Sequence, residues 1–264
     1  MVKPVLPVFH LPDRAKTVLA IGDIHDSPAI GKDRFYWVGK HANAIGCDEV
    51  VQIGDWATLD SLCSYVGNDT YSGRLKGTVE TDFKSLEESH EYFERGLENH
   101  KCKKHITLGN HEDRIWSYQE RNPEIYGMLS FRHEDILKSF KWGFTKFGEY
   151  HFVDGVGFIH IPLNIMGRPV GGINAEQTIS NHTTHDIVCG HTHRFKFITS
   201  PKVGNKPRLS VCNLGCALPQ FHVEDYAKHS QTGWSWGVTE LVISNGMITD
   251  HAFISMTTLE RKYG

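Results

Sequence analysis

Aspartate, asparagine and histidine side chains follow a series of short apolar runs in this sequence of 264 residues. Each run leads into a polar cluster, and the clusters are Asp23-Ile24-His25, Gly54-Asp55, Gly109-Asn110-His111, His160 and Gly190-His191-Thr192-His193. Taken singly, each cluster could be a helix cap, a turn or a buried histidine with an ordinary partner. Taken together, they offer the oxygen and nitrogen donors that suit transition ions, whereas Ca²⁺ and Mg²⁺ prefer oxygen alone. The set therefore predicts a site for two transition-metal ions.

The elements that must position these side chains alternate between strands and helices. Runs rich in Val and Ile predict strands over 18–21, 50–53, 105–108, 156–159 and 187–189. Helical spacing predicts one helix over 35–45, ended by Gly46, and a second over 83–97, with Asp82 as its candidate N-cap. Ligands of such α/β sheets bind beyond the carboxyl ends of the strands. We therefore expect the five clusters to converge on one place.

The second half of the chain has a more antiparallel pattern. Hairpin turns are predicted at Val153-Asp154-Gly155-Val156 and at Asn245-Gly246, and the segments 209–218 and 236–256 alternate like strands. The segments 61–80 and 115–148 lack a clean period and are expected to form loops or a small cap over the site. We expect residues 1–264 to form a single domain.

The five clusters resemble, in order, the five motifs of the calcineurin-like metallophosphoesterase superfamily, which read D-x-H, G-D, G-N-H-[E/D], H and G-H-x-H. The resemblance covers residues 17–215, including the turn Asn213-Leu214-Gly215 after the last motif. It implies a four-layer α-β-β-α sandwich of two mixed sheets with flanking helices, and a dinuclear metal site at the carboxyl ends of the strands. The two divalent ions would be Mn²⁺ first, with Fe, Zn or Ni as alternatives.

The resemblance also implies a role for each residue of the site. Asp23, His25 and His193 would hold one metal, and Asn110, His160 and His191 would hold the other. Asp55 would bridge both ions together with a hydroxide that attacks the phosphorus. His111 would contact the phosphate and protonate the leaving oxygen, as a histidine near its ordinary pKa can do at neutral pH. Asn110 would also contact the substrate.

Several positions keep more than one interpretation. His160 is preferred as the fourth motif because it ends an apolar run, but His151, His182 and His185 are rivals. Glu112 is expected to orient a metal ligand through a hydrogen bond. Arg114 could reach a substrate phosphate or pair with a carboxylate. Aromatic residues that could stack a base, or else pack loops onto the core, are Trp56, Tyr65, Tyr71, Trp116 and Tyr118.

Two departures from the family pattern bear on the substrate. Asp26 stands where the family often has glycine, and Trp56-Ala57 follows Asp55 where Ser/Thr protein phosphatases continue toward Asp-Arg-Gly. We expect metal-dependent hydrolysis of phosphate esters, with phosphodiester or nucleotide-type substrates favoured. The alternatives are a phosphomonoesterase, including a protein phosphatase, a DNA nuclease, or a catalytically silent module that binds metal or phosphate.

Composition narrows the class of protein further. Lys and Arg number 28 against 31 Asp and Glu, without a basic block that would mark a nucleic-acid surface. No apolar stretch is long enough to span a membrane, and Met1–Asp13 lacks the apolar core of a signal peptide. We expect a cytoplasmic protein without an obligate protein partner. The six cysteines include no Cys-x-x-Cys pair, so reduced thiols are expected and a thiolate metal site is not.

Overall fold

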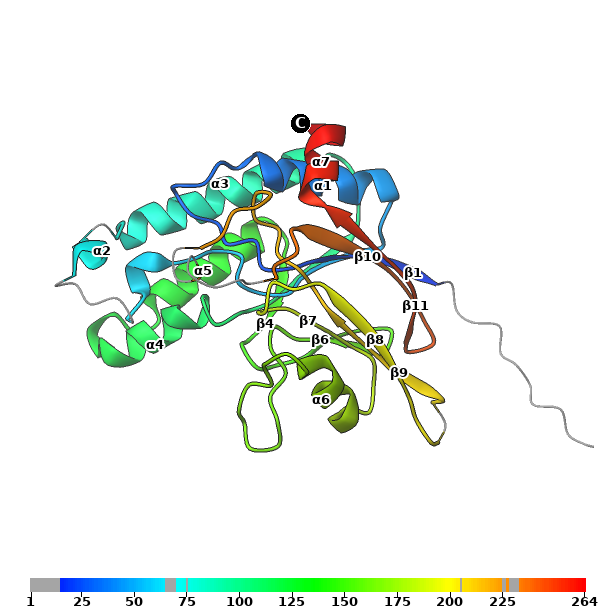
Figure 1. Cartoon of the computed structure of the whole chain (residues 1–264). Coiled ribbons are helices and arrows are strands. Elements are labelled where there is room, and N and C mark those ends of the chain that lie inside the picture. The colour runs from blue at the N-terminus through cyan, green and yellow to red at the C-terminus, as the bar shows by residue number, and fades with distance from the viewer. Residues whose placement is uncertain (1–14, 65–69, 75, 205, 225–226, 228–232) are drawn as a thin grey trace, which may run out of the picture.

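Two β-sheets lie face to face in the centre of the molecule, with helices on both outer sides (Figure 1). The computed structural model describes residues 15–64, 70–74, 76–204, 206–224, 227 and 233–264. The expectation for Met1–Asp13 lies outside these residues, as does the one for Tyr65. Within the described ranges, no helix has the length and apolar character needed to cross a membrane.

The first sheet has six strands in the order β11-β10-β1-β2-β3-β4. Its strands are β1 (Lys16–Ile21), β2 (Glu49–Gln52), β3 (Lys103–Thr107), β4 (Gly143–Thr145), β10 (Gly237–Ser244) and β11 (Met247–Ser255). The pairs β1–β2, β2–β3 and β3–β4 are parallel, whereas β10 pairs antiparallel with both β1 and β11. The parallel part aligns the carboxyl ends of β1, β2 and β3 at one edge.

The second sheet has five strands in the order β5-β6-β7-β9-β8. Its strands are β5 (His151–Val153), β6 (Val156–Phe158), β7 (Ile187–Cys189), β8 (Lys196–Pro201) and β9 (Arg208–Asn213). The strands β6, β7 and β9 are parallel, and β5 and β8 close the two edges antiparallel. Both sheets are therefore mixed, as predicted.

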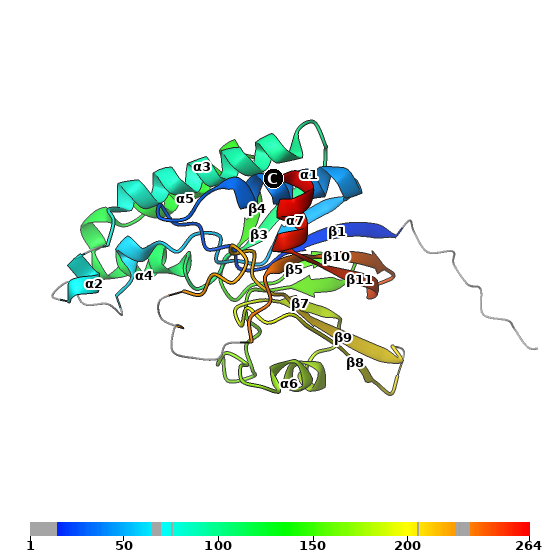
Figure 2. The same cartoon turned by 45° about the horizontal axis from the view of Figure 1, so that its top comes forward.

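Helices cover the outer face of each sheet (Figure 2). On the side of the first sheet lie α1 (Asp33–Ile45), α3 (Val79–Leu97), α4 (Asp113–Arg121), α5 (Met128–Ser139) and α7 (Met256–Tyr263). The second sheet carries α6 (Ala175–His182). The short helices are α2 (Tyr71–Arg74), η1 (Asp60–Leu62) and η2 (Pro123–Ile125).

Three apolar clusters fill the spaces between these layers. In β1, Leu19 and Ile21 pack with the helices, whereas Val18 and Ala20 face the second sheet, because side chains alternate along a strand. A third cluster, which includes Ile179 of α6, packs between that helix and the second sheet. Three interlayer cores require four layers, which confirms the predicted α-β-β-α sandwich.

The local predictions hold with two differences. The second predicted helix begins at Val79, and its N-cap is Thr78 rather than Asp82. Asp82 lies inside the helix instead, where its carboxylate accepts hydrogen bonds from the backbone and hydroxyl of Ser61 (3.1 and 2.6 Å). The segment 115–148, expected as a loop or small cap, contains most of α4, all of α5, and β4, which joins the first sheet.

Candidate metal centre

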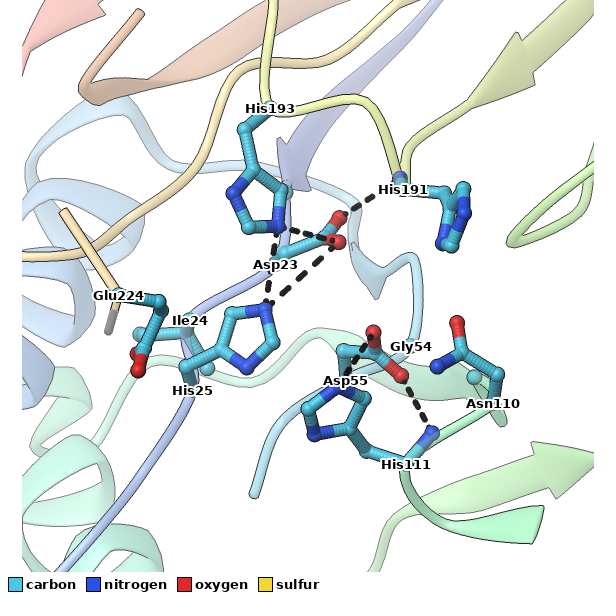
Figure 3. Close-up of polar contacts among 12 residues, drawn as sticks. Asp23, Ile24, His25, Gly54, Asp55, Asn110, His111, His191, His193 and Glu224 are labelled. Atoms are coloured by element: carbon cyan, nitrogen blue, oxygen red, sulfur yellow. Dashed lines mark hydrogen bonds and ion pairs between the residues drawn. The ribbon is translucent and has the colours of Figure 1, made fainter. Parts of the chain in front are cut away.

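The predicted site residues meet where the carboxyl ends of the two sheets come together. Asp23 and His25 follow β1, Asp55 follows β2, and Asn110 and His111 follow β3. The second sheet adds His160 after β6, and His191 and His193 after β7. In Figure 3, Asp23, His25 and His193 form one group beside a second group that contains Asp55, Asn110 and His111. The structure thus brings together all eight residues.

The loops that present these side chains have strained backbones. Four of the eight residues adopt the left-handed region, with φ values of 46° for His25, 55° for Asp55, 68° for His191 and 57° for His193. Non-glycine residues rarely adopt this conformation, and strain of this kind gathers at functional sites, where the surrounding structure maintains it. The tertiary structure therefore holds these four residues in an unfavourable backbone conformation that places their side chains in the site.

Two glycines permit the close approach that the site requires. A Cβ atom on Gly109 would lie 2.1 Å from Oδ1 of Asp55, and one on Gly190 would lie 2.6 Å from Oδ1 of Asp23. Each glycine comes directly before a cluster of site residues in the sequence. The glycines of the G-N-H and G-H-x-H motifs are explained by this contact, because any side chain would push the carboxylate away.

In each of the two aspartates, Asp23 and Asp55, the two carboxylate oxygens have different kinds of partner. Oδ1 of Asp23 accepts a hydrogen bond from the His191 amide (3.0 Å), and Oδ1 of Asp55 accepts one from the His111 amide (2.9 Å). Oδ2 of Asp23 lies 3.0 Å from Nε2 of His193, and Oδ2 of Asp55 lies 3.4 Å from Nε2 of His160. One oxygen of each carboxylate thus ties two loops together, and the other faces imidazole nitrogens.

The distances among the donor atoms match those of metal ligands. Two ligand atoms on one ion lie roughly 3.0–3.4 Å apart when each is about 2.1 Å from the metal. Besides the two Oδ2 distances above, Nε2 of His25 lies 3.1 Å from Nε2 of His193, and Nε2 of His160 lies 3.0 Å from Oδ1 of Asn110. The residues present therefore fit divalent ions.

The donor atoms form groups that share members. The atoms of Asp23, His25 and His193 lie within 4.8 Å of one another, and so do those of Asp55, His160 and His191. A third group of the same size, His25, Asp55 and His111, connects the first two. Asp55 thus lies between the two candidate ion positions, where a bridging ligand belongs.

Buried charge also favours cations at this place. Burial, followed by the neighbouring charges of Asp23 and Glu112, raises the pKa of Asp55 well above its usual value. Burial would raise the pKa of Asp23 as well, but the adjacent His193 ring holds it below its ordinary value. Ionised carboxylates that are buried close together repel one another. Divalent ions between them would remove that repulsion.

Two of the candidate ligands, His25 and His191, have the protonation state that metal binding requires. Burial, reinforced by neighbouring imidazoles, lowers the pKa of His25 well below its usual value and that of His191 to about 4. Metal ligands must be neutral imidazoles, so both rings are ready to bind near pH 7. The Nδ1–H of His160 donates to the carbonyl of Ile53 (3.0 Å), which leaves the lone pair of its Nε2 toward Asp55 and Asn110.

The three rival histidines lie elsewhere. His151 bonds to Glu49 (2.8 Å) and stacks on His105, with ring centroids 3.6 Å apart. His182 is exposed at the end of α6, and His185 packs edge-on against Tyr150. Of these four candidates for the fourth motif, His160 is therefore the one that the structure brings beside Asp55.

His111 has a defined orientation beside the metal ligands. Its Nδ1–H donates to the carbonyl of Thr58 (2.9 Å), and its Nε2 accepts from the Arg114 guanidinium (3.2 Å). Burial, and then the charge of Arg114, lowers the pKa of His111 well below its usual value. The expectation of an ordinary pKa is therefore wrong for the protein without substrate, because the ring is desolvated next to a cation. Arg114 also pairs with Asp60 (3.5 Å), which confirms the predicted pairing with a carboxylate; its contact with a substrate phosphate stays a prediction.

Glu112 joins the loop that follows β2 to the loop that follows β3. Its buried carboxylate accepts three backbone hydrogen bonds, from Asp55 (2.9 Å), Ala57 (3.1 Å) and Gly109 (2.8 Å). The bond to the Asp55 amide fixes the backbone of the candidate bridging residue. Glu112 thus orients a candidate ligand through the main chain.

Asp26, which departs from the family pattern, and the aromatic residues that could stack a base have partners within the protein. The Asp26 carboxylate pairs with Lys32 and accepts from the hydroxyl of Ser85 (2.7 Å). Trp56 is buried in the core, where its Nε1 donates to Ser89 (2.8 Å) and its ring stacks on His90. It packs loops rather than stacking substrate. Trp116 and Tyr118 are partly buried and also pack against that core.

Sequence reasoning missed two supports of the site. Arg34 of α1 is almost fully buried and donates to the carbonyls of Ile24 and His25 (both 3.2 Å), so it fixes the loop after β1. Trp234 packs edge-on against His193, with ring centroids 4.2 Å apart. Arg34 lies within a helical pattern and Trp234 is far from every motif, so neither had a signal in the sequence.

The solved structures described below resemble this chain distantly. No family model matches the sequence, and no curated protein matches it either. Among solved structures, the chain is similar to wild-type Vps29 of Entamoeba histolytica complexed with zinc, with 15% identity and a TM-score of 0.36 over 91% of this chain and 99% of that one. It is also similar to TT1561 of Thermus thermophilus, with 9% identity and a TM-score of 0.32 over 76% of this chain and 90% of that one. Likeness at this level carries no argument about function.

Proposed function

We propose that the protein is a dinuclear metallophosphoesterase that hydrolyses phosphate esters. The observation that carries the proposal is the position of Asp55 between two groups of metal-binding side chains, with His111 beside both. Phosphoesterases of this kind need a carboxylate that holds two ions close together against their repulsion. The order of the sequence motifs, which resembles that of the calcineurin-like superfamily, supports the same assignment.

Each residue of the candidate metal centre would have a defined role in hydrolysis. Asp23, His25 and His193 would hold one ion, Asn110, His160 and His191 the other, and Asp55 both. When bound, the ions acidify water and neutralise charge on phosphate oxygens. Arg114 presents hydrogen-bond donors and positive charge beside His111, on the side of the centre where a phosphate would lie. A phosphate oxygen that accepts from Arg114 would release Nε2 of His111 from its present bond, so that it could carry the proton for the leaving oxygen.

Within this class we propose phosphodiester or nucleotide-type substrates over phosphoproteins. The segment after Asp55 supports this choice. Trp56-Ala57 stands where protein phosphatases continue toward Asp-Arg-Gly, and the Trp56 side chain is buried in the core. Phosphomonoesters and DNA remain as comparison substrates in the test.

The test uses metal-stripped protein reloaded with Mn²⁺, Ni²⁺, Zn²⁺ or Fe²⁺. We expect turnover of bis(p-nitrophenyl) phosphate with at least one ion, faster than turnover of p-nitrophenyl phosphate. Cyclic nucleotides, dinucleoside polyphosphates and single- and double-stranded DNA complete the panel. Two bound ions without turnover of any substrate would contradict the enzyme and favour a silent binding module.

Two variants test the assignment of ligands. Asp55→Asn should lower the occupancy of both ions, because one carboxylate serves both. His160→Asn should lose one ion, whereas the matched control His182→Asn should lose none, because His182 is exposed and away from the site. Metal analysis of the purified variants provides the readout. Full occupancy in Asp55→Asn would show that the carboxylate is not the bridge.

A further inference from the structure

A second cluster of metal-binding side chains lies at the opposite edge of the first sheet. Cys47 comes two residues before β2, and Cys102 comes directly before β3, with His100 two residues earlier. The strands β2 and β3 are parallel neighbours, with Glu49 paired to Lys103. Their amino ends therefore meet at one edge, whereas Asp55 and Asn110 follow the carboxyl ends of the same two strands.

The geometry of this cluster suits a single ion. The two sulfur atoms and a ring nitrogen of His100 lie within 4.8 Å of one another. Nε2 of His100 donates a hydrogen bond to the carbonyl of Cys47 (2.7 Å), so the neutral ring keeps its lone pair on Nδ1. A hydrogen bond from the other ring nitrogen to a backbone carbonyl is the usual support of a metal-binding histidine.

The two thiols interact with each other and lie among charged side chains. The ammonium group of Lys104 and the carboxylates of Glu94 and Glu49 lie near Cys102, and Lys104 pairs with Glu94. Cys47 is buried, but His100 and Cys102 are partly exposed, so an ion can reach the cluster from solvent.

We propose that Cys47, His100 and Cys102 bind one Zn²⁺ ion, independently of the candidate metal centre. Two sulfurs and an imidazole are donors that zinc prefers, and three protein ligands leave the fourth tetrahedral position for water. The ion would join the turn before β2 to the turn before β3. Its role would be to hold together the two strands whose other ends carry Asp55 and Asn110.

Cobalt substitution tests this site without relying on activity. Reduced protein loaded with Co²⁺ should show the near-ultraviolet charge-transfer band of cobalt–thiolate bonds. The proposed ligands of the metal centre are oxygen and nitrogen atoms, so they cannot produce this band. Cys102→Ser should abolish it and lower the zinc content by about one ion per chain. Cys63→Ser, the matched control at a partly exposed cysteine outside the cluster, should leave both unchanged.

The outcomes separate this proposal from the proposed function. Asp55→Asn should lose turnover and keep the cobalt–thiolate band, since the two sites share no ligand. A reduced wild-type protein without the band, or a band that persists in Cys102→Ser, would overturn the zinc site. A Cys47–Cys102 disulfide in protein isolated with zinc and without reductant, seen as a loss of two hydrogens in the intact mass, would also overturn it in favour of a redox pair.

Discussion

The imidazole of His111 is held between a carbonyl and a cation, and this environment defines what it can do. Thr58 accepts its Nδ1–H, and Arg114 donates to its Nε2. In this state the ring is neutral and has no proton to offer on the side of the metal centre. An acid role therefore depends on the substrate, whose negative charge would engage Arg114 and raise the proton affinity of Nε2.

Removal of this imidazole should separate metal binding from catalysis. We expect His111→Ala to keep both ions and to lose roughly 10²–10⁴-fold in kcat on substrates with poor leaving groups, because general acid catalysis contributes that much. The loss should be smaller for nitrophenyl esters, whose leaving oxygen needs no proton. Rate measurements on a series of aryl and alkyl esters check this. An equal loss on every ester would show that His111 binds phosphate but does not protonate the leaving group.

At the scale of elements, the loops after β2 and β3 are joined by one carboxylate. Glu112 satisfies three backbone N–H groups of these loops, and a glutamine can satisfy only those that face its carbonyl oxygen. Glu112→Gln should therefore destabilise the protein by about 1–3 kcal/mol, the cost of a stranded buried donor.

Urea unfolding checks this loss of stability, and metal content should fall with it because the Asp55 backbone is released. Glu124→Gln, at an exposed position of η2, is the matched control and should leave both unchanged. A Glu112→Gln protein with the stability and metal content of the wild type would show that the carboxylate is not needed to hold the loops.

The helices α1 and α3 pack closely because each contributes a glycine at the contact. A Cβ atom on Gly39 would lie 2.2 Å from the carbonyl oxygen of Phe93, and one on Gly96 would lie 2.2 Å from that of Tyr36. Gly39→Ala should lower the free energy of unfolding by about 1–3 kcal/mol, because the clash outweighs the better helix propensity of alanine.

Gly31→Ala is the control for this substitution, since nothing lies within 4 Å of its added Cβ. Its stability should stay within about 0.5 kcal/mol of the wild type. Chemical denaturation of both variants provides the comparison. If Gly39→Ala proved as stable as Gly31→Ala, the two helices would have room to separate without cost.

At the scale of the whole molecule, the outer core between the first sheet and its helices contains histidines as well as apolar residues. His133 of α5 is buried, and burial lowers its pKa to about 4. The unfolded chain takes up this proton near pH 6.5, but the folded protein does so only near pH 4. Stability is therefore unaffected by this group above about pH 6.5, falls as the pH drops toward 4, and levels off below.

The size of this effect can be measured by difference. His133→Leu removes the titrating group, so between pH 6.5 and 4 it should lose about 3 kcal/mol less stability than the wild type. Urea unfolding in the presence of a chelator keeps metal loss out of the comparison. The control is His182→Leu at an exposed position, which should follow the wild type. Parallel curves for His133→Leu and the wild type would contradict the prediction.

The sequence by itself determined the main strands of the α/β core and the identity of the candidate donors. Strand and helix periods are local patterns, so β1, β2, β3, β6 and β7 could be located within a few residues from apolar runs and glycines. The polar residues that end these strands converge because parallel strands share an edge, a rule that needs no coordinates. The candidate site was predictable for this reason.

Contacts between distant segments decided the rest. The tertiary structure confirmed His160, which the sequence preferred, over its rival His151 as the histidine beside Asp55. It also placed Trp56 in the core, where the sequence had left open a position at the rim of the site. The lowered pKa of His111 depends on burial and on Arg114, which no spacing reveals. The cluster of Cys47 with His100 and Cys102 likewise has no short sequence motif, because two neighbouring strands bring the sulfur atoms together.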